Sequence, residues 1–321
     1  MKKQPLLVVV GPTASGKTAL AVELAKKYNG EVISADSMQI YRGMDIATAK
    51  PTQDEMQGIR HHLLNFAEPD KPFSVAEYLK LARETIAQVA RGGKMPVVAG
   101  GTGLYISSLL DHVQFSEATS KSPVRDRLQT LAEEIGPDAM HAKLAEVDPE
   151  TARTLHPNNR FRIIRALEVF ELTGKPFSEV KASSRVEESP YEVCMLGLGF
   201  HDRQKLYDRI NRRVDVMLEK GLLEEAHAVY ETGGLQTACQ AIGYKEFLPY
   251  FNGGTPLDIC VDKLKQETRR YAKRQLTWFR RDERIQWLYV DELDGMQNIL
   301  ERSEKIIANS KVMCYNEMNY I

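Results

Sequence analysis

The sequence predicts an α/β fold in which a parallel sheet is flanked by helices and interrupted by an all-helical insertion domain. Short apolar, β-branched runs of the buried-strand type alternate with stretches whose apolar residues recur at helical spacing. These runs stop in the middle of the chain, where short helical patterns alternate with Pro, Asp and Asn. We therefore divide the chain into a first part of the core (residues 1–112), an insertion (residues 113–191) and a return to the core (residues 192–321).

The first apolar run, residues 6–10, leads straight into the pattern G-x-x-x-x-G-K-T and then into a helical stretch over residues 19–27. Backbone N–H groups of such a loop and the positive end of the helix favour an anion. Lys17 adds a full charge, and the Thr18 hydroxyl is of the kind that holds Mg²⁺ against phosphates. A glycine-rich turn without a ligand can match the same pattern, but here strand, loop and helix occur together. We predict a P-loop NTPase-like core that binds a diphosphate or triphosphate. The loop residues assigned to this site are Gly11, Pro12, Thr13, Ala14, Ser15, Gly16, Lys17 and Thr18.

Two further apolar runs end in loops that we expect beside the phosphate loop, because the carboxyl ends of parallel strands meet at one edge of a sheet. Residues 31–36 end at Asp36, which is either a group that takes part in chemistry or an Asp that forms a turn. Residues 96–99 run into two glycines and Thr102, where many P-loop ATPases carry an Asp. The glycines allow close backbone approach, and Thr102 offers a hydroxyl to a phosphate oxygen. No apparatus that activates water is evident.

Three basic segments could contact an anionic partner. Arg162 and Arg165 share one face of a helix predicted in the insertion. Arg209 and Arg213 are spaced i, i+4, so both guanidinium groups can reach one anion. The helix predicted over residues 257–282 interleaves basic and aromatic residues, which suits a nucleic-acid backbone. A solvated basic face or a charged helix with a packed aromatic side explains the same patterns, and the residues alone leave both open.

Composition narrows the function classes. The 321 residues carry a formal net charge of −1, so a nucleic-acid partner must be held by a local basic patch. The four cysteines are far apart, which argues against zinc and against a disulfide framework. The pair His61 and His62 lacks a third ligand at helical spacing, so we expect hydrogen bonding rather than metal binding. We find no room for a signal peptide and no apolar run of membrane-spanning length, and expect a cytoplasmic protein with no membrane partner.

Several motifs together resemble one family, the bacterial type of tRNA dimethylallyltransferase (tRNA isopentenyltransferase). The loop Asp-Ser-Met-Gln-Ile-Tyr at residues 36–41 is the most specific match. Two positions depart from the pattern: Asn65 stands where the family often has Asp, and Phe161 stands where some members have a polar residue. We therefore assign neither a polar role. The matching segments are residues 11–18, 36–41, 48–51, 100–105, 156–158, 162, 165–168, 243–244 and 273–278.

The resemblance implies transfer of a dimethylallyl group from dimethylallyl diphosphate to N6 of the adenosine 3′ of a tRNA anticodon. An adenine N6 is a weak nucleophile, and Asp36 would accept its proton as general base. Stabilisation of the departing diphosphate would fall to Lys17, Thr18 with Mg²⁺, Thr102 and Arg213, joined by Arg209. The insertion would grip the anticodon stem-loop, and we expect a monomer. The resemblance assigns tRNA contacts to Asp36, Ser37, Met38, Gln39, Thr102, Arg125, Arg162, Arg165, Gln240, Gly243, Tyr244 and Lys245.

Two other functions fit part of the sequence. A P-loop kinase, or an isopentenyltransferase acting on free adenine nucleotides, explains the phosphate loop and the Arg209–Arg213 pair, and should work without tRNA. A nucleotide-driven RNA-binding switch should hydrolyse ATP or GTP slowly. The first gives the insertion and the late basic helix no purpose, and the second leaves Asp36 and Thr102 unused.

Overall fold

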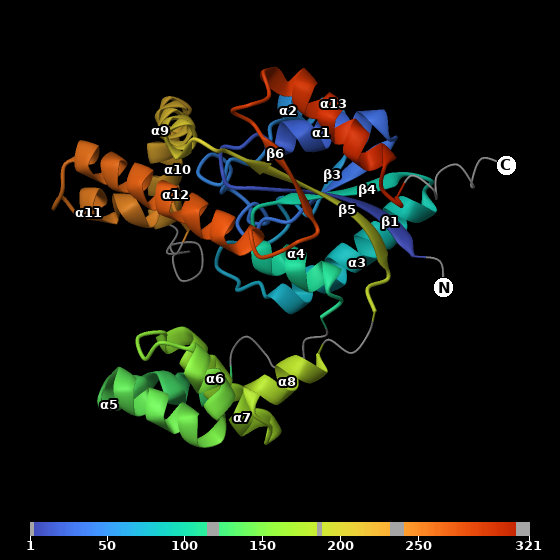
Figure 1. Cartoon of the computed structure of the whole chain (residues 1–321). Coiled ribbons are helices and arrows are strands. Elements are labelled where there is room, and N and C mark those ends of the chain that lie inside the picture. Colours follow the sequence, from blue (N-terminus) through green and yellow to red (C-terminus); the bar gives the residue numbers. More distant parts are fainter. Residues whose placement is uncertain (1–2, 114–121, 185–187, 232–240, 313–321) are drawn as a thin grey trace. The chain divides into compact units, whose positions relative to one another are not determined.

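The computed structural model describes residues 3–113, 122–184, 188–231 and 241–312. The chain divides into two compact units (Figure 1). The core unit comprises Met1–Leu110 and Ser189–Ile321, and the helical unit comprises Asp111–Glu188. The sequence-based boundaries of the insertion are residues 113 and 191.

The core unit is built on one parallel sheet of six strands in the order β3-β2-β4-β1-β5-β6. Leu7 of the central strand pairs with Val97 on one side and with Cys194 on the other. Because the strands are parallel, the loops that follow β1, β2 and β4 leave the sheet at the same edge. The strands are β1 (Gln4–Val10), β2 (Gly30–Ser34), β3 (His61–His62), β4 (Met95–Gly100), β5 (Tyr191–Gly199) and β6 (Ile285–Tyr289).

Helices cover both faces of the sheet. Leu6, Val8 and Val10 of β1 pack toward α3 and α4, whereas Leu7 and Val9 pack toward α1 and α13 (Figure 1). Burial on both faces explains why the strand is apolar throughout instead of alternating. These helices are α1 (Lys17–Lys27), α3 (Val75–Arg91), α4 (Gly103–Leu110) and α13 (Gly295–Ala308). The sequence analysis assigned no element to α13.

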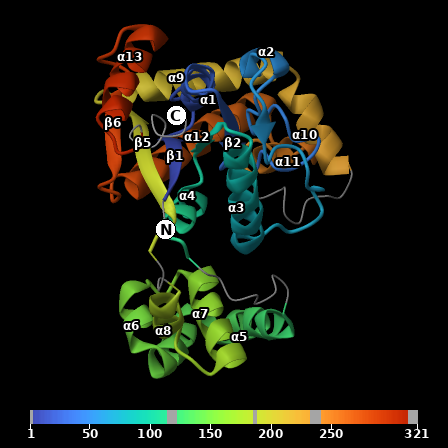
Figure 2. The same ribbon diagram turned by 90° about the vertical axis from the view of Figure 1, so that its right-hand side faces the viewer.

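A second group of helices packs around the loop that follows β2. Ile40, Tyr41 and Met44 of that loop are buried against α9, α10 and α12, and Figure 2 shows these helices side by side. The predicted helix over residues 257–282 corresponds to α12. The remaining core helices are α2 (Gln53–Met56), α9 (Arg203–Glu219), α10 (Leu222–Glu231), α11 (Leu248–Phe251), α12 (Leu257–Phe279) and the 3₁₀ turn η2 (Lys245–Phe247).

The helical unit has its own hydrophobic core, which includes Leu128, Leu144 and Ile163. Its helices are α5 (Pro123–Val147), α6 (Pro149–Thr154), α7 (Arg160–Thr173) and α8 (Phe177–Ser183). Gly136 has φ 79° and breaks α5 before Pro137, so α5 consists of two helical segments. The short helices α6 and α8 were not predicted.

The structure also describes the histidine pair, two of the cysteines and the length of the helices. His62 Nε2 lies 2.6 Å from a Glu31 carboxylate oxygen and His61 Nδ1 lies 2.9 Å from the Ile59 carbonyl oxygen, so the hydrogen-bonding roles are confirmed. Cys194 and Cys260 are buried free thiols, while Cys239 and Cys314 lie outside the described residues. In the described part of the chain, no helix combines the length and apolar character needed to cross a membrane.

Candidate active site

The phosphate loop connects β1 to α1 in a conformation that needs its glycines. Gly11 has φ 147°, and a Cβ there would lie 2.6 Å from the Leu198 carbonyl oxygen. Gly16 caps α1 in the left-handed conformation with φ 99°. Lys17 Nζ donates to the Pro12 carbonyl oxygen at 2.6 Å, so the side chain folds back over the loop. The loop therefore presents its ammonium group and the amino end of α1 at one place.

Two helices that follow far later in the chain brace this loop. Gln275 of α12 is buried; its Oε1 accepts from the Thr13 backbone N–H at 2.8 Å, and its Nε2 donates to the Gly101 carbonyl oxygen at 3.0 Å. The side chain thus ties the phosphate loop to the end of β4. Arg209 of α9 donates from Nε to the Ala14 carbonyl oxygen at 2.9 Å. Of the predicted pair of arginines, Arg209 is therefore held by the loop itself.

Positive charge is concentrated beside the loop. Burial and the neighbouring Arg213 guanidinium lower the pKa of Lys17 to about 7, and the charge of Asp36 opposes this shift. Burial also lowers the pKa of Arg213, as does Arg209, against the attraction of Glu55 and Asp36. Like charges that depress one another's pKa values are stabilised when an anion arrives. The structure thus brings Lys17, Arg209 and Arg213 together, as the sequence predicted, at a site that suits a polyanion.

Asp36 lies at the start of the loop after β2, which we call the Asp36 loop (residues 36–50). Its Oδ1 accepts from the backbone N–H groups of Met38 at 2.9 Å and Gln39 at 3.4 Å. Thr102, at the end of β4, accepts from the Ser37 backbone N–H at 3.0 Å and donates to the Ser37 hydroxyl at 3.3 Å. Asp36 therefore forms a turn, and at the same time stands within the electrostatic reach of Lys17 and Arg213.

Side chains within the Asp36 loop fix its path. Gln39 donates from Nε2 to the carbonyl oxygens of Thr48 at 3.2 Å and Ala49 at 3.1 Å. Lys50 donates to the Tyr41 carbonyl oxygen at 2.7 Å and to Asn65 Oδ1 at 3.1 Å. The sequence analysis assigned Asn65 no polar role, and the structure gives it one, because this amide oxygen helps to hold the lysine. The amide nitrogen of Gln39 is likewise occupied by the protein backbone.

The segment predicted to contact tRNA near residue 243 packs on the Asp36 loop. Gly243 has φ 106°, and a Cβ there would lie 2.6 Å from the Ala47 Cβ. Tyr244 is 2% exposed and its hydroxyl donates to Glu225 at 2.8 Å, so its side chain packs inside the protein and is not presented to a partner. Lys245 is exposed. Gln240 lies outside the described residues.

Two aromatic residues of α12 lie close to the residues that follow β4, and the sequence analysis did not assign them to the site. Burial and the nearby Asp36 charge raise the pKa of Tyr271, and the neighbouring Thr102 and Gln275 side chains oppose this shift. Trp278 packs against Gly103, where a Cβ would lie 2.3 Å from the indole ring. The glycines after β4 therefore allow close approach of α12. The sequence analysis had noted aromatics in this helix without assigning them.

The arginines of the helical unit do not share one role. Glu168 is fully buried and accepts from Arg125 at 2.7 Å, Arg165 at 2.7 Å and the Ser122 hydroxyl at 2.6 Å. These partners hold the pKa of the Glu168 carboxyl below its ordinary value despite burial. By contrast, Arg162 is exposed and forms no ion pair with any described residue. Of the three, Arg162 has its charge available for a partner.

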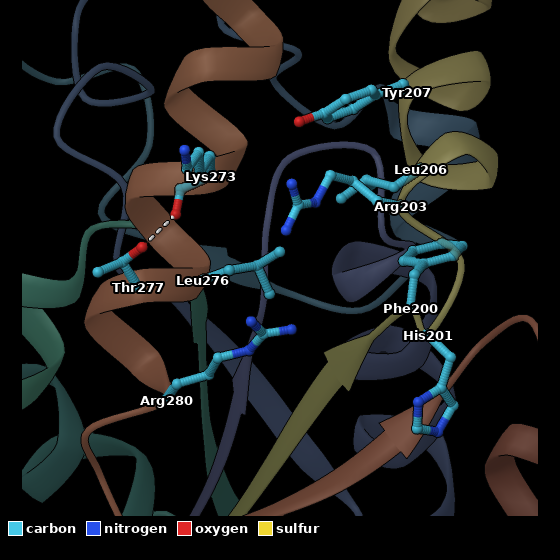
Figure 3. A pocket seen from close by; sticks show the side chains of 9 residues that line it. All are labelled: Phe200, His201, Arg203, Leu206, Tyr207, Lys273, Leu276, Thr277 and Arg280. Carbon is cyan, nitrogen blue, oxygen red and sulfur yellow. Dashed lines mark hydrogen bonds between the residues drawn. The ribbon is translucent and has the colours of Figure 1, made fainter.

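A basic pocket of about 120 Å³ lies between the end of β5, α9 and α12. Figure 3 shows the guanidinium groups of Arg203 and Arg280 extending toward the same space. Among the described residues, neither of these arginines nor Lys273 forms an ion pair with a carboxylate. The lining residues are Phe200, His201, Arg203, Leu206, Tyr207, Lys273, Leu276, Thr277 and Arg280.

The donor set beside the loop fits a magnesium ion that is held jointly with a ligand. Mg²⁺ usually takes one or two protein oxygens and completes its shell with phosphates and water. The described residues contain no cluster of three His, Cys, Asp or Glu that could hold a metal alone. Thr18 offers a hydroxyl at the start of α1, and the buried Ser15 hydroxyl has no hydrogen-bond partner in the described structure. Polar groups are therefore left for a bound phosphate with its cation.

Comparisons with known proteins match the chain to one family. The family model described as IPP transferase matches residues 39–282. A tRNA dimethylallyltransferase of Caldanaerobacter subterraneus subsp. tengcongensis is 47% identical over 306 residues, covering 94% of this chain and 97% of that protein. The one from Geobacillus thermodenitrificans is 50% identical over 306 residues, covering 95% and 96%.

Solved structures extend the match to three dimensions. The crystal structure of a tRNA isopentenylpyrophosphate transferase from Bacillus halodurans has a TM-score of 0.73 at 42% identity, and the match covers 99% of this chain and 100% of that one. A eukaryotic dimethylallyltransferase acting on tRNA has a TM-score of 0.81 at 30% identity, with 96% and 80% covered. The fold is thus shared along nearly the whole length, and the chain belongs to the IPP transferase family.

Proposed function

We propose that the chain transfers the dimethylallyl group of dimethylallyl diphosphate to N6 of the adenosine that follows the anticodon in tRNA. The observation that carries the proposal is the juxtaposition of Asp36 with the cations Lys17 and Arg213 at one edge of the sheet. A transfer of this kind needs a proton acceptor and a site for a departing polyanion close together. The family membership of the chain supports the same reaction.

On the donor side, the chain binds a diphosphate and stabilises it as it leaves. The C1–O bond of the allylic diphosphate breaks, and its electron pair stays on the diphosphate. Lys17 and Arg213 stabilise the negative charge that develops there, and Arg209 adds a third cation at the same loop. Magnesium, held by Thr18 together with the diphosphate, supplies further Lewis-acid stabilisation when bound.

On the acceptor side, the chain holds the adenine and removes a proton. A new bond forms between N6 and C1, and Asp36 accepts the proton that N6 loses. Ser37, Met38 and Thr102 stand next to this carboxylate and would contact the base. Extrusion of the base costs least from a single-stranded loop, which suits an anticodon loop.

The RNA backbone would be held by cations that the protein leaves unpaired. Arg162 in the helical unit, and Lys273 and Arg280 in the basic pocket, are the clearest candidates in the described part of the chain. Contacts to phosphate position the substrate and carry little sequence information. We place the reaction in the cytoplasm and assign it to a single copy of the chain; light scattering of the purified protein tests the second point.

Incubation with Mg²⁺, radiolabelled dimethylallyl diphosphate and unmodified tRNA, with AMP and ATP as parallel acceptors, tests this function. We expect label in the tRNA at the adenosine 3′ of the anticodon. Label in AMP or ATP would make the chain a nucleotide-prenylating enzyme. Phosphate release from ATP without any label transfer would contradict the proposed roles of both halves of the site.

A further inference from the structure

Glu225, on the first turn of α10, receives hydrogen bonds from two separate segments of the site. Its Oε2 accepts from the backbone N–H groups of Asp45 and Ile46, both at 2.8 Å. Its Oε1 accepts from the Ala47 backbone N–H at 3.0 Å and from the Tyr244 hydroxyl at 2.8 Å. Successive N–H groups that converge on one carboxylate form a concave anion site, which here is filled by the protein's own side chain.

The two segments joined by Glu225 are those that the acceptor would meet. One is the Asp36 loop, and the other is the Gly243 turn (residues 243–246). They are also in direct contact, since a Cβ on Gly243 would lie 2.6 Å from the Ala47 Cβ. The turn is closed by the Gly243 backbone N–H, which donates to Glu246 Oε2 at 2.8 Å. A shift of either segment would therefore move the other.

Hydrogen bonds, joined by one short stretch of backbone, lead from this carboxylate back to Asp36. Residues 45–47 are followed directly by Thr48 and Ala49, whose carbonyl oxygens accept from the Gln39 side chain. The Gln39 backbone N–H in turn donates to Asp36 Oδ1 at 3.4 Å. The proton acceptor, the loop and the turn thus form one connected framework that has Glu225 at its far end.

We propose that Glu225 is a positioning residue that sets the Asp36 loop and the Gly243 turn in register for the tRNA acceptor. This inference rests on the proposed function, because it assigns both segments to the acceptor. The position of Glu225 at the amino end of α10 favours its negative charge. The Tyr244 hydroxyl is a steady donor, because burial and the Glu225 charge raise its pKa. In the described part of the chain, the hydrogen bonds of Glu225 go to residues 45–47 and Tyr244 and none reaches the phosphate loop, so the donor half should not depend on it.

The variant Glu225→Gln tests the inference with little change in size. Each carboxylate oxygen accepts at least one backbone N–H, so an NH₂ group in either place would face a donor. We expect kcat/KM for tRNA to fall by about 10- to 100-fold, because small displacements of reacting groups have effects of this order. Inorganic pyrophosphate affinity should stay within about twofold. Amide hydrogen exchange should accelerate at residues 45–47.

Two further variants separate positioning from a general role in folding. Glu224→Gln makes the same charge change at the neighbouring exposed position of α10 and should leave all three readouts unchanged. Tyr244→Phe removes the link to the Gly243 turn alone, so it should weaken tRNA binding while exchange at residues 45–47 stays slow.

Two results would overturn the inference. One is wild-type tRNA kinetics in folded Glu225→Gln protein. The other is a parallel loss of tRNA and pyrophosphate binding, which would mean that Glu225 supports the whole core. Failure of the proposed function is distinguishable, because then the wild-type protein itself would not label tRNA, whereas exchange and pyrophosphate binding need no transfer reaction.

Discussion

The phosphate loop and the Asp36 loop lie at the same edge of the sheet but are built in different ways. The phosphate loop takes its anion-binding groups from consecutive residues, and its two glycines set the backbone. The Asp36 loop is held by side chains from distant segments, such as Glu225, whose partner Asp45 lies 180 positions away. A site built from consecutive backbone groups can be recognised in the sequence, and the ligand that it binds is difficult to change by substitution. A site held by side chains from distant segments can change its acceptor by changes at several distant positions.

The largest effect should come from Asp36→Asn, which removes the proposed proton acceptor and keeps its size. We expect turnover to fall by about 10²- to 10⁴-fold, the range contributed by a positioned general base. Pyrophosphate and tRNA should still bind, because the amide oxygen can accept the Met38 N–H. Single-turnover label transfer with saturating substrates measures the effect. Near-normal turnover would remove Asp36 from the base role.

Lys17→Met tests the other half of the site. Loss of one preorganised cation at a departing anion should lower kcat by about 10²- to 10³-fold. Pyrophosphate binding should weaken as well, while the affinity for the anticodon stem-loop stays unchanged, because the hydrogen bond that Lys17 donates goes to Pro12 of the phosphate loop. Calorimetry with each ligand distinguishes the two. An equal loss of affinity for pyrophosphate and for the stem-loop would contradict the separation of the donor site from the acceptor site.

The lowered pKa of Lys17 predicts how donor binding depends on pH. In the free protein the pKa is about 7, and a bound polyanion raises it. Below pH 7 the lysine is protonated with or without ligand, so affinity does not change through this group. Above pH 7, binding takes up a proton, and affinity should fall by up to about tenfold per pH unit. Binding of pyrophosphate measured from pH 6 to 9 tests this. Protonation of pyrophosphate itself contributes equally to the wild type and to Lys17→Met. The variant should therefore lose only the additional pH dependence of affinity that Lys17 causes.

Gln275→Ala tests whether α12 supports the phosphate loop. The variant leaves the Thr13 N–H and the Gly101 carbonyl without their partner in a buried place, which should cost about 1–3 kcal/mol of unfolding free energy. Gln266→Ala, at an exposed position of the same helix, should change it by no more than about 0.5 kcal/mol. Urea unfolding measures both. Equal stabilities of the two variants would mean that α12 does not brace the phosphate loop.

The smallest effect should come from Arg162→Ala in the helical unit. Removal of one phosphate contact should lower the slope of log affinity against log salt by about 1, with no loss of stability. Arg165→Ala is the matched change on the same helix, but it takes a partner from the buried Glu168 and should destabilise the unit. Filter binding over a salt series, with thermal unfolding, tells the two apart. An unchanged salt slope for Arg162→Ala would remove it from the RNA interface.

The two loops also differ in how far the sequence predicts them. The phosphate loop and the cations Lys17, Arg209 and Arg213 could be predicted, because their signals are contiguous or lie one helical turn apart. Gln275 could not, since its partner Thr13 is 262 positions away and a polar residue on a charged helix looks like part of a solvated face. For the same reason the roles of Glu225 and Tyr271 could not be predicted from the sequence. Tyr244 was assigned to tRNA from the resemblance, and only the tertiary structure shows its side chain buried.

The most direct test of separate donor and acceptor halves is a crossed binding measurement on wild type, Lys17→Met and Glu225→Gln. Each protein is titrated with inorganic pyrophosphate and, separately, with the unmodified anticodon stem-loop. We predict that Lys17→Met loses pyrophosphate affinity alone and that Glu225→Gln loses stem-loop affinity alone. Loss of both affinities in either variant would contradict the account, because it would mean that the two loops form a single binding unit.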